Sequence, residues 1–257
     1  MRMNSKLDRK KSIFYNVVPF VSIAMFILFW HCAIDWLDVP KYVLVGPVDV
    51  VKAWIKNAPE IMEAISVTVR EIIFGYLIGV SCGILLALIF TSNDFLNNAI
   101  SPYIIFLICT PQMVLIPLLM MKLGFEISLK VAAVSISTFP INMMSTQTGV
   151  RSVSAERYEL MQSLRASKLQ TFFKVLVPSA LPNVFTGMRL ATIFATTSAV
   201  GGELLCSTAG IGKWVSYYSN FLRMDVCLAY ILTMVIISVS FYLLINGLEM
   251  VVVKRFK

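Results

Sequence analysis

The chain has 257 residues, of which 58% are hydrophobic and only 14% are charged, and its mean hydropathy is +0.81. So few polar side chains cannot cover a water-soluble globule of this size, which excludes the soluble folds and indicates a membrane protein. The net charge of +8 would favour nucleic acid as partner of a soluble protein, but the basic residues here flank apolar segments, which favours membrane lipid and no nucleic acid.

Six apolar segments are long enough to cross a bilayer, which takes roughly 20 helical residues. They lie near residues 13–34, 64–90, 98–121, 127–148, 180–203 and 226–251. The first follows a basic start, but it is too long for a cleaved signal peptide and lacks a small-residue cleavage site, so we expect it to be retained. The predicted fold is an all-α membrane protein with six transmembrane helices, forming one domain over residues 1–257.

The distribution of basic residues predicts the orientation of these spans. Lysine and arginine concentrate in the N-terminal tail, in the loop of about residues 149–179 and in the C-terminal tail, and the remaining loops carry fewer. Because cytoplasmic loops are enriched in positive charge, both termini and the 149–179 loop are predicted to be cytoplasmic. On the other side, residues 47–56 have an apolar stripe that predicts a short interfacial helix anchored by Trp54.

The second and third spans differ in the residues that shape their backbones. Gly75, Gly79 and Gly83 repeat at four-residue spacing in the second span, which predicts close packing against a neighbouring helix. The third span contains three prolines, Pro102, Pro111 and Pro117, and interior prolines break a helix. Broken backbone in a membrane is tolerated where it is buried in protein or lines a wet cavity.

Two interpretations of the broken third span stay open. In one, Gln112 and Met113 lie beside the path of a solute; in the other, the break only bends the helix. The charges inside spans are equally ambiguous. Arg70 and Arg189 either contact a solute or extend to the membrane–water interface. Glu203 follows two glycines, and it either lines a gate or has no such role.

Neither a metal site nor a catalytic site is expected. The single histidine, His31, excludes a Ser-His-Asp triad and a histidine-based metal site. The five cysteines are scattered through apolar segments without a C-x-x-C pair, so they are predicted to be packing residues. We therefore expect a protein that is not an enzyme and carries no metal or cofactor.

The 149–179 loop is polar and helix-prone in an otherwise apolar chain. Ser154 is placed to cap a helix with Glu156 in its first turn, ending near Arg165. A second helix is predicted from Ser167, at capping-box spacing from Gln170, to just before Pro178. Two short amphipathic helices at a tight corner favour docking into a groove of another protein; a surface helix resting on lipid headgroups is the alternative.

This loop resembles the cytoplasmic signature of permease subunits of binding-protein-dependent ABC importers. The family pattern is E-A-A, three residues, G, nine residues, I-x-L-P. In this chain Glu159 stands at the acid, Leu160 and Met161 at the two alanines and Arg165 at the glycine, and the pattern ends with Val175 at the isoleucine and Val177-Pro178 at the closing pair. The similarity runs from about Leu44 to the last span and is greatest to the nitrate, sulfonate and taurine type.

The resemblance implies a type I importer fold and a role in coupling for residues of the loop. The residues expected to contact the ATPase are Glu156, Glu159, Leu160, Met161, Leu164, Arg165, Ala166 and Ser167. Where the family has glycine, Arg165 is expected either to bear a left-handed backbone at a cost of about 1 kcal/mol or to change the corner. Leu160 and Met161 enlarge the docking surface relative to two alanines.

The resemblance also implies the partners. They are two ABC ATPase subunits, a second permease that is identical or related, and an extracellular or periplasmic solute-binding protein, all at a bacterial plasma membrane. The motif AGIGKW lacks the spacing of a P-loop, so ATP is expected to bind the partner subunits. The alternative is a secondary transporter not driven by ATP, against which the chain shows no internal repeat. Relatives carry small anions or neutral vitamin precursors, and the sequence leaves the solute open.

Overall fold

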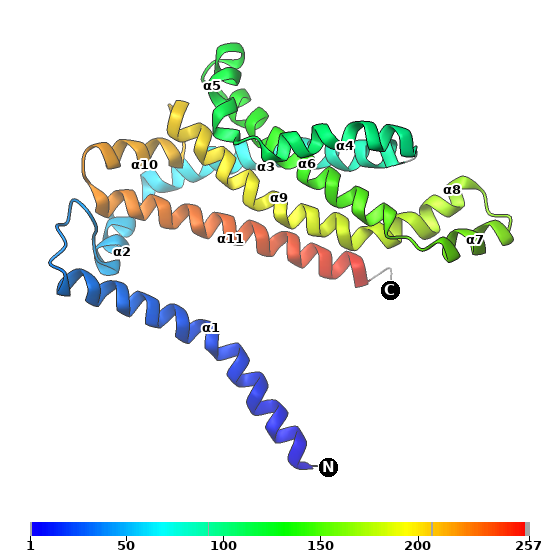
Figure 1. Cartoon of the computed structure of the whole chain (residues 1–257). Helices are drawn as coiled ribbons and strands as arrows, with labels where there is room; N and C mark the ends of the chain where they lie inside the picture. The colour runs from blue at the N-terminus through cyan, green and yellow to red at the C-terminus, as the bar shows by residue number, and fades with distance from the viewer. Residues whose placement is uncertain (1, 92, 207, 255–257) are drawn as a thin grey trace. The chain divides into compact units, whose positions relative to one another are not determined.

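The computed structural model describes residues 2–91, 93–206 and 208–254, and it describes side chains from Val17 onward. The described residues are helical, with short turns and no strand (Figure 1). The basic side chains expected to orient the N-terminal tail, together with Arg255 and Lys257, lie outside the described part. The chain divides into two compact units, one made of residues 1–58 and 217–229, the other of residues 59–216 and 230–257.

The first unit contains α1 (Arg2–Trp36) and α2 (Pro47–Lys56). Residues Val17–Trp36 of α1 form an apolar segment long enough to cross a membrane. The short helix α2 begins with Pro47 in its first turn, where a missing N–H costs nothing. It ends at Asn57, whose backbone N–H and side-chain Nδ2 both donate to the Ala53 carbonyl. The helix predicted over residues 47–56 is confirmed.

The second unit is built around α3 (Ala58–Thr91), α6 (Ile127–Arg151) and α9 (Val177–Cys206). The glycines of α3 lie against α6, because a Cβ on Gly79 would come within 2.0 Å of the Thr138 Oγ1 and 2.6 Å of the Ser135 carbonyl. This confirms the close packing predicted for the glycine repeat. Tyr76 of α3 also meets Phe241 of α11 (Met224–Lys254) edge to face at 4.8 Å.

The third predicted span is a pair of helices, α4 (Asp94–Cys109) and α5 (Gln112–Leu123). They meet at Thr110 and Pro111 with a bend of 95°, so the predicted break is confirmed at the middle proline. Four described helices qualify as spans on their own, and six spans result if each bent pair counts as one. The second bent pair joins residues 168–206 to α10 (Ile211–Asn220).

One predicted helix end is wrong. The second loop helix does not stop before Pro178, because α8 (Lys168–Thr171) continues through a π-helical segment, η1 (Phe172–Leu176), into α9. In η1 the Val177 N–H bonds to the carbonyl of Phe172, five residues back. Pro178 has no N–H to donate, and its ring would clash with the preceding turn of a regular α-helix. The wider π-helical turn before it accommodates the proline.

Candidate functional site

The 149–179 loop turns a tight corner between α7 (Ala155–Ser163) and α8. Arg165 stands at the corner with φ of 50°, in the left-handed region. Its N–H donates to the Gln162 carbonyl at 2.8 Å, and the next N–H, of Ala166, donates to the Met161 carbonyl at 2.9 Å. These two bonds form a Schellman motif, which ends a helix and normally has glycine at this position. Arg165 therefore bears the strained backbone itself.

Side-chain hydrogen bonds fix both helices of the loop. Ser167 and Gln170 form the predicted capping box, with bonds of 2.8 and 3.2 Å. Ser154 occupies the N-cap of α7 with an extended backbone, but its side chain makes no capping bond. Arg157 donates from Nη1 to the Ser179 hydroxyl at 2.9 Å, which ties α7 to the first turn of α9.

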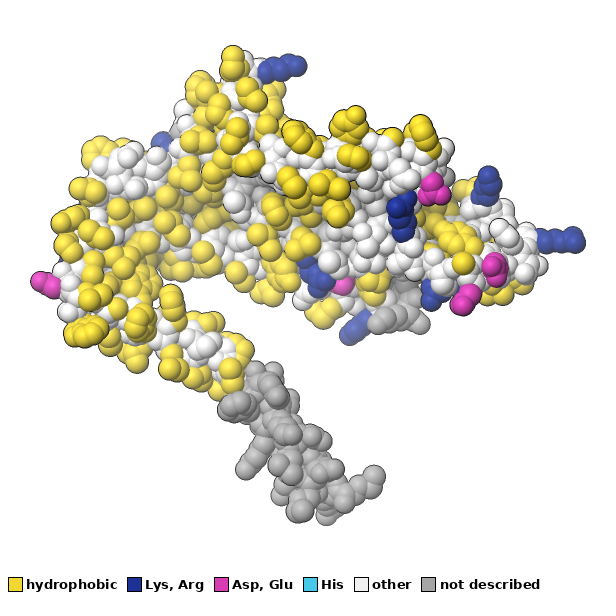
Figure 2. All heavy atoms as spheres, in the orientation of Figure 1, with side chains coloured by type: hydrophobic (Ala, Val, Ile, Leu, Met, Phe, Trp, Pro, Cys, Tyr) yellow, Lys and Arg dark blue, Asp and Glu magenta, His cyan; other side chains and the backbone are white. Residues whose placement is uncertain are grey.

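Four large apolar side chains of the loop are exposed, although the loop is otherwise polar. Their exposed fractions are 60% for Leu160, 67% for Leu164, 69% for Leu169 and 64% for Phe173. We call these four residues the apolar residues of the loop, and Figure 2 shows hydrophobic side chains among charged ones where α7 and α8 lie. Tyr158 is half-buried, and this burial raises the pKa of its phenol.

The other residues proposed for coupling lie beside these four. Met161 and Ala166 are half-buried, and Glu156, Glu159, Arg165 and Ser167 are exposed. α7 has no buried residue. The exposed side chains of this helix, among them Glu156, Glu159 and Leu160, are therefore accessible to a partner.

The break between α4 and α5 brings Gln112 and Met113 to a cavity against α9. The cavity has a volume of about 280 Å³, and Ser198 of α9 also lines it. The Ser198 hydroxyl is buried and has no hydrogen-bond partner among the described residues. A second cavity of about 300 Å³ is lined by Met113, Thr196 and Ser238. Met113 thus borders two cavities that carry hydroxyl groups, where a polar solute or water would find partners.

Arg189 lines neither of these cavities. Its Nη1 lies 3.0 Å from the Glu249 Oε2 and donates to the Asn246 Oδ1 at 3.1 Å, so it joins α9 to α11. The charge of Arg189 is thereby matched within the protein. Arg70 is exposed.

Glu203 is buried, with only 1% of its surface exposed. Its Oε1 accepts from the Thr68 hydroxyl at 2.6 Å and its Oε2 from the Gly212 N–H at 2.7 Å, while Thr68 also accepts from the Ile211 N–H at 3.0 Å. Glu203 and Thr68 together satisfy the first N–H groups of α10, an arrangement that stabilises a helix start. Glu203 therefore fixes α10 to α3 and α9.

Glu71 and Lys130 complete this buried cluster through interactions with Glu203. Lys130 is buried in the first turn of α6, where its Nζ donates to the Phe125 carbonyl at 2.5 Å. Residues Lys130, Val134, Ser137 and Ile141 all lie on the buried stripe of α6. That helical spacing is the signal that could have placed Lys130 inside.

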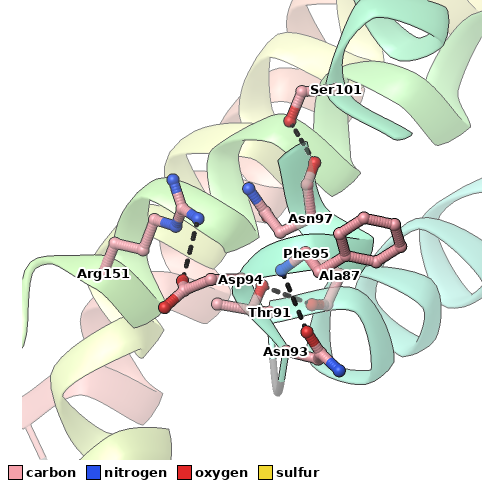
Figure 3. A network of polar contacts seen from close by, with 8 residues as sticks. All are labelled: Ala87, Thr91, Asn93, Asp94, Phe95, Asn97, Ser101 and Arg151. Atoms are coloured by element: carbon pink, nitrogen blue, oxygen red, sulfur yellow. Dashed lines mark hydrogen bonds and ion pairs between the residues drawn. The ribbon is translucent and has the colours of Figure 1, made fainter. Parts of the chain in front are cut away.

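A polar network lies where α6 ends and the 149–179 loop begins (Figure 3). Arg151 approaches Asp94 at 3.5 Å, and Asn93 caps α4 by accepting from the Phe95 N–H at 2.9 Å. One turn along α4, the Asn97 carbonyl accepts from Ser101 at 2.6 Å. The end of α6 is thus held beside the start of α4.

Residues 79–257 match the family of binding-protein-dependent transport system inner membrane components. The chain belongs to this family. It is thus the multi-pass permease subunit of an ABC importer, as the resemblance of the loop implied.

Individual relatives agree with this assignment. The formylaminopyrimidine transport permease protein ThiX of Halalkalibacterium halodurans is 28% identical over 203 residues, which are 79% of this chain and 81% of ThiX. The taurine transport system permease protein TauC of Escherichia coli is 27% identical over 196 residues, 76% of this chain and 68% of TauC. A crystal structure of an amino acid ABC transporter with histidines has the same fold, with a TM-score of 0.61 at 18% identity, covering 78% of this chain and 96% of that one.

Proposed function

We propose that this permease imports a small polar solute across a bacterial plasma membrane, driven by two ATPase subunits that dock on the 149–179 loop. The chain itself is not the catalytic subunit; ATP binds and is hydrolysed in the partners. A second permease, identical or related, completes the path, and an external solute-binding protein delivers the solute.

The observation that carries this proposal is the exposure of the four apolar residues of the loop. Leu160 lies in α7, a short polar helix with no buried residue, and Leu164 is the C-cap residue that follows it. Exposing such side chains to water is unfavourable by about 25 cal/mol per Å². A groove of a partner protein that binds these side chains would remove this cost, and a movement of that partner would then displace α7.

Transmission from the loop to the path would run through α9. Arg157 links α7 to the start of α9, and further along α9 Ser198 lines the cavity at Gln112 and Met113. We propose that displacement of α7 shifts α9 and changes this cavity between two states, one open to each side. Relatives are named for formylaminopyrimidine, taurine and bicarbonate transport, which supports a small polar solute as cargo.

Docking is tested by co-purification of the ATPase with Leu160→Asp and Leu164→Asp variants. Each variant places a charge in the expected contact, and we expect recovery of the ATPase subunit to fall at least tenfold and uptake to be lost. Gln162→Asp is the matched control, because Gln162 is an exposed polar residue of the same helix and should retain the ATPase. Uptake that continues without ATP, driven by an ion gradient, would instead support a secondary transporter.

The path is tested separately with Met113→Trp. The larger side chain would fill the cavities on both sides of Met113, so we expect uptake to fall at least tenfold while ATPase recovery stays unchanged. Normal uptake in this variant would place the solute elsewhere.

A further inference from the structure

A polar cavity that the proposed function does not use lies between α4 and α6. Its volume is about 180 Å³. Asn97, Gln147 and Arg151 give it a polar end, and Ile105 and Met144 form part of its apolar wall. Figure 3 shows Asn97 and Arg151 on the facing sides of α4 and α6.

Two amide atoms at this cavity are buried without a partner. Asn97 is 3% exposed and Gln147 is 8% exposed. In the described part of the chain, neither the Asn97 Oδ1 nor the Gln147 Nε2 makes a hydrogen bond. Buried polar atoms almost always have partners, so an unpaired acceptor and an unpaired donor at one cavity indicate a ligand with both kinds of group.

The neighbouring hydroxyls do not serve these amides. Ser101 donates to the Asn97 carbonyl at 2.6 Å, and Thr148 donates to the Met144 carbonyl at 2.9 Å, so both hydroxyl protons are used within their own helices. A donor on the ligand can therefore satisfy the Asn97 Oδ1.

Arg151 makes the polar end suitable for an anion. Its side chain is 47% exposed, and its only ion pair among the described residues is the contact of 3.5 Å between its Nη2 and the Asp94 Oδ1. A guanidinium has five N–H donors in a planar fork that matches phosphate geometry, so most of its donors stay available.

The wall of the cavity points to a lipid as the source of that anion. Ile105 and Met144 line the cavity and are 52% and 48% exposed. Both belong to helices that qualify, alone or as a bent pair, as membrane spans. An acyl chain can therefore lie against these two residues while its head group occupies the polar end.

We propose that this cavity binds the head group of an ethanolamine phospholipid. The phosphate lies at Arg151 and the Gln147 Nε2, the ammonium group donates to the Asn97 Oδ1, and an acyl chain follows Ile105 and Met144. A free phosphate ester with an amino group has the same head-group chemistry, and the acyl chain distinguishes the two sources.

The test measures the thermal unfolding midpoint of the full chain in detergent with three additives at equal concentration. These are a short-chain phosphatidylethanolamine, a phosphatidylglycerol with the same chains, and free phosphoethanolamine. We expect phosphatidylethanolamine to raise the midpoint of the wild-type chain by several degrees, at least three times the shift given by phosphatidylglycerol. Free phosphoethanolamine should give no shift.

The variant Asn97→Leu/Gln147→Leu removes both unpaired amides. We expect it to lose the shift with phosphatidylethanolamine and to have a higher midpoint than wild type without additive, because the two unpaired amide atoms are no longer buried at this cavity. Thr148→Val is the matched control: it alters a hydroxyl at the same cavity that is already bonded within α6 and should keep the lipid shift.

Lipid retained by the purified wild-type chain is measured by mass spectrometry, which does not depend on how well a variant folds. We expect about one phosphatidylethanolamine per chain after extensive washing. Equal shifts in wild type and the double variant would place the lipid elsewhere on the chain, and no retained lipid would leave a cavity that holds only water. Either result would overturn the proposal. An equal shift with free phosphoethanolamine would overturn the lipid source.

Discussion

Arg165 occupies a backbone conformation in which a side chain is a disadvantage. Its φ of 50° places it in the left-handed region, where a Cβ crowds the following carbonyl at a cost of roughly 1–2 kcal/mol. The two hydrogen bonds that close the corner are still made. The hydrogen bonds therefore determine the conformation of the corner, and Arg165 adopts the left-handed backbone that these bonds require.

We predict that Arg165→Gly stabilises the chain. Glycine adopts this conformation without steric cost, so the free energy of unfolding should rise by about 1 kcal/mol, and the midpoint of thermal unfolding by about 2–4 °C. The measurement is thermal unfolding in detergent. Arg165→Ala is the control, because alanine keeps the Cβ and should give less than half of this gain. Equal gains in both variants would mean that the charge of Arg165, and not its backbone, is the unfavourable feature.

Glu203 and Thr68 act as a pair at the start of α10. We predict that Glu203→Leu lowers the free energy of unfolding by about 1–3 kcal/mol, because the Gly212 N–H and the Thr68 hydroxyl lose their acceptor in a buried site. Glu203→Gln keeps one acceptor oxygen and should cost less. Chemical denaturation measures both effects.

A double-mutant cycle isolates the contact itself. Thr68→Val and Glu203→Leu, alone and combined, should give a coupling energy of at least 0.5 kcal/mol, as residues in direct contact do. Additive effects would show that the bond of 2.6 Å between Thr68 and Glu203 contributes nothing to stability.

The helices α3 and α6 approach so closely that the space between them holds no side chain at Gly79. We predict that Gly79→Ala is destabilising, since its new Cβ would overlap the Thr138 Oγ1 and the Ser135 carbonyl; overpacking of this kind costs about 1–3 kcal/mol. Gly247→Ala in α11 is the matched control. Among the described residues no atom lies within 4 Å of the added Cβ, so alanine should stabilise that helix by up to about 1 kcal/mol. Effects of the same sign in the two variants would contradict close packing at Gly79.

Local rules predicted most elements but not their junctions. The sequence predicted a break in the third span but not at which of its three prolines: the break lies at Pro111, whereas Pro102 and Pro117 lie inside α4 and α5. The prediction of a helix end before Pro178 applied the same rule and was wrong, because η1 absorbs that proline in a wider turn. Which of the two outcomes occurs depends on how neighbouring helices fill the space around the proline.

The candidate site divides in the same way. The capping box follows from residues a few positions apart, and the sequence predicted it. The left-handed backbone at Arg165 was one of two alternatives left open by the resemblance to the family pattern. The cluster of Thr68, Lys130 and Glu203 joins three helices and was missed in part. Such contacts depend on which faces of two helices pack together. The burial pattern along a helix shows which of its faces is buried, but not which helix packs against that face.

At the scale of the whole molecule, the proposed docking of the ATPases and of the solute-binding protein both depend on the orientation of the chain in the membrane. The ATPases must reach α7 from the cytoplasm, and the solute-binding protein must approach from the opposite side. The basic residues near α7 include Arg157, Arg165 and Lys168, and positive charge near span ends favours the cytoplasmic side.

We predict that α7 is cytoplasmic and that the end of α10 is external. The measurement uses a membrane-impermeant maleimide and a chain in which the five native cysteines are replaced by serine. Gln162→Cys in α7 and Asn220→Cys at the end of α10 are both exposed positions. In intact cells Asn220→Cys should react and Gln162→Cys should not, and both should react after the membrane is permeabilised. The reverse pattern would place the loop outside the cell, where no ATPase could dock on it, and the apolar residues of the loop would then require an external partner.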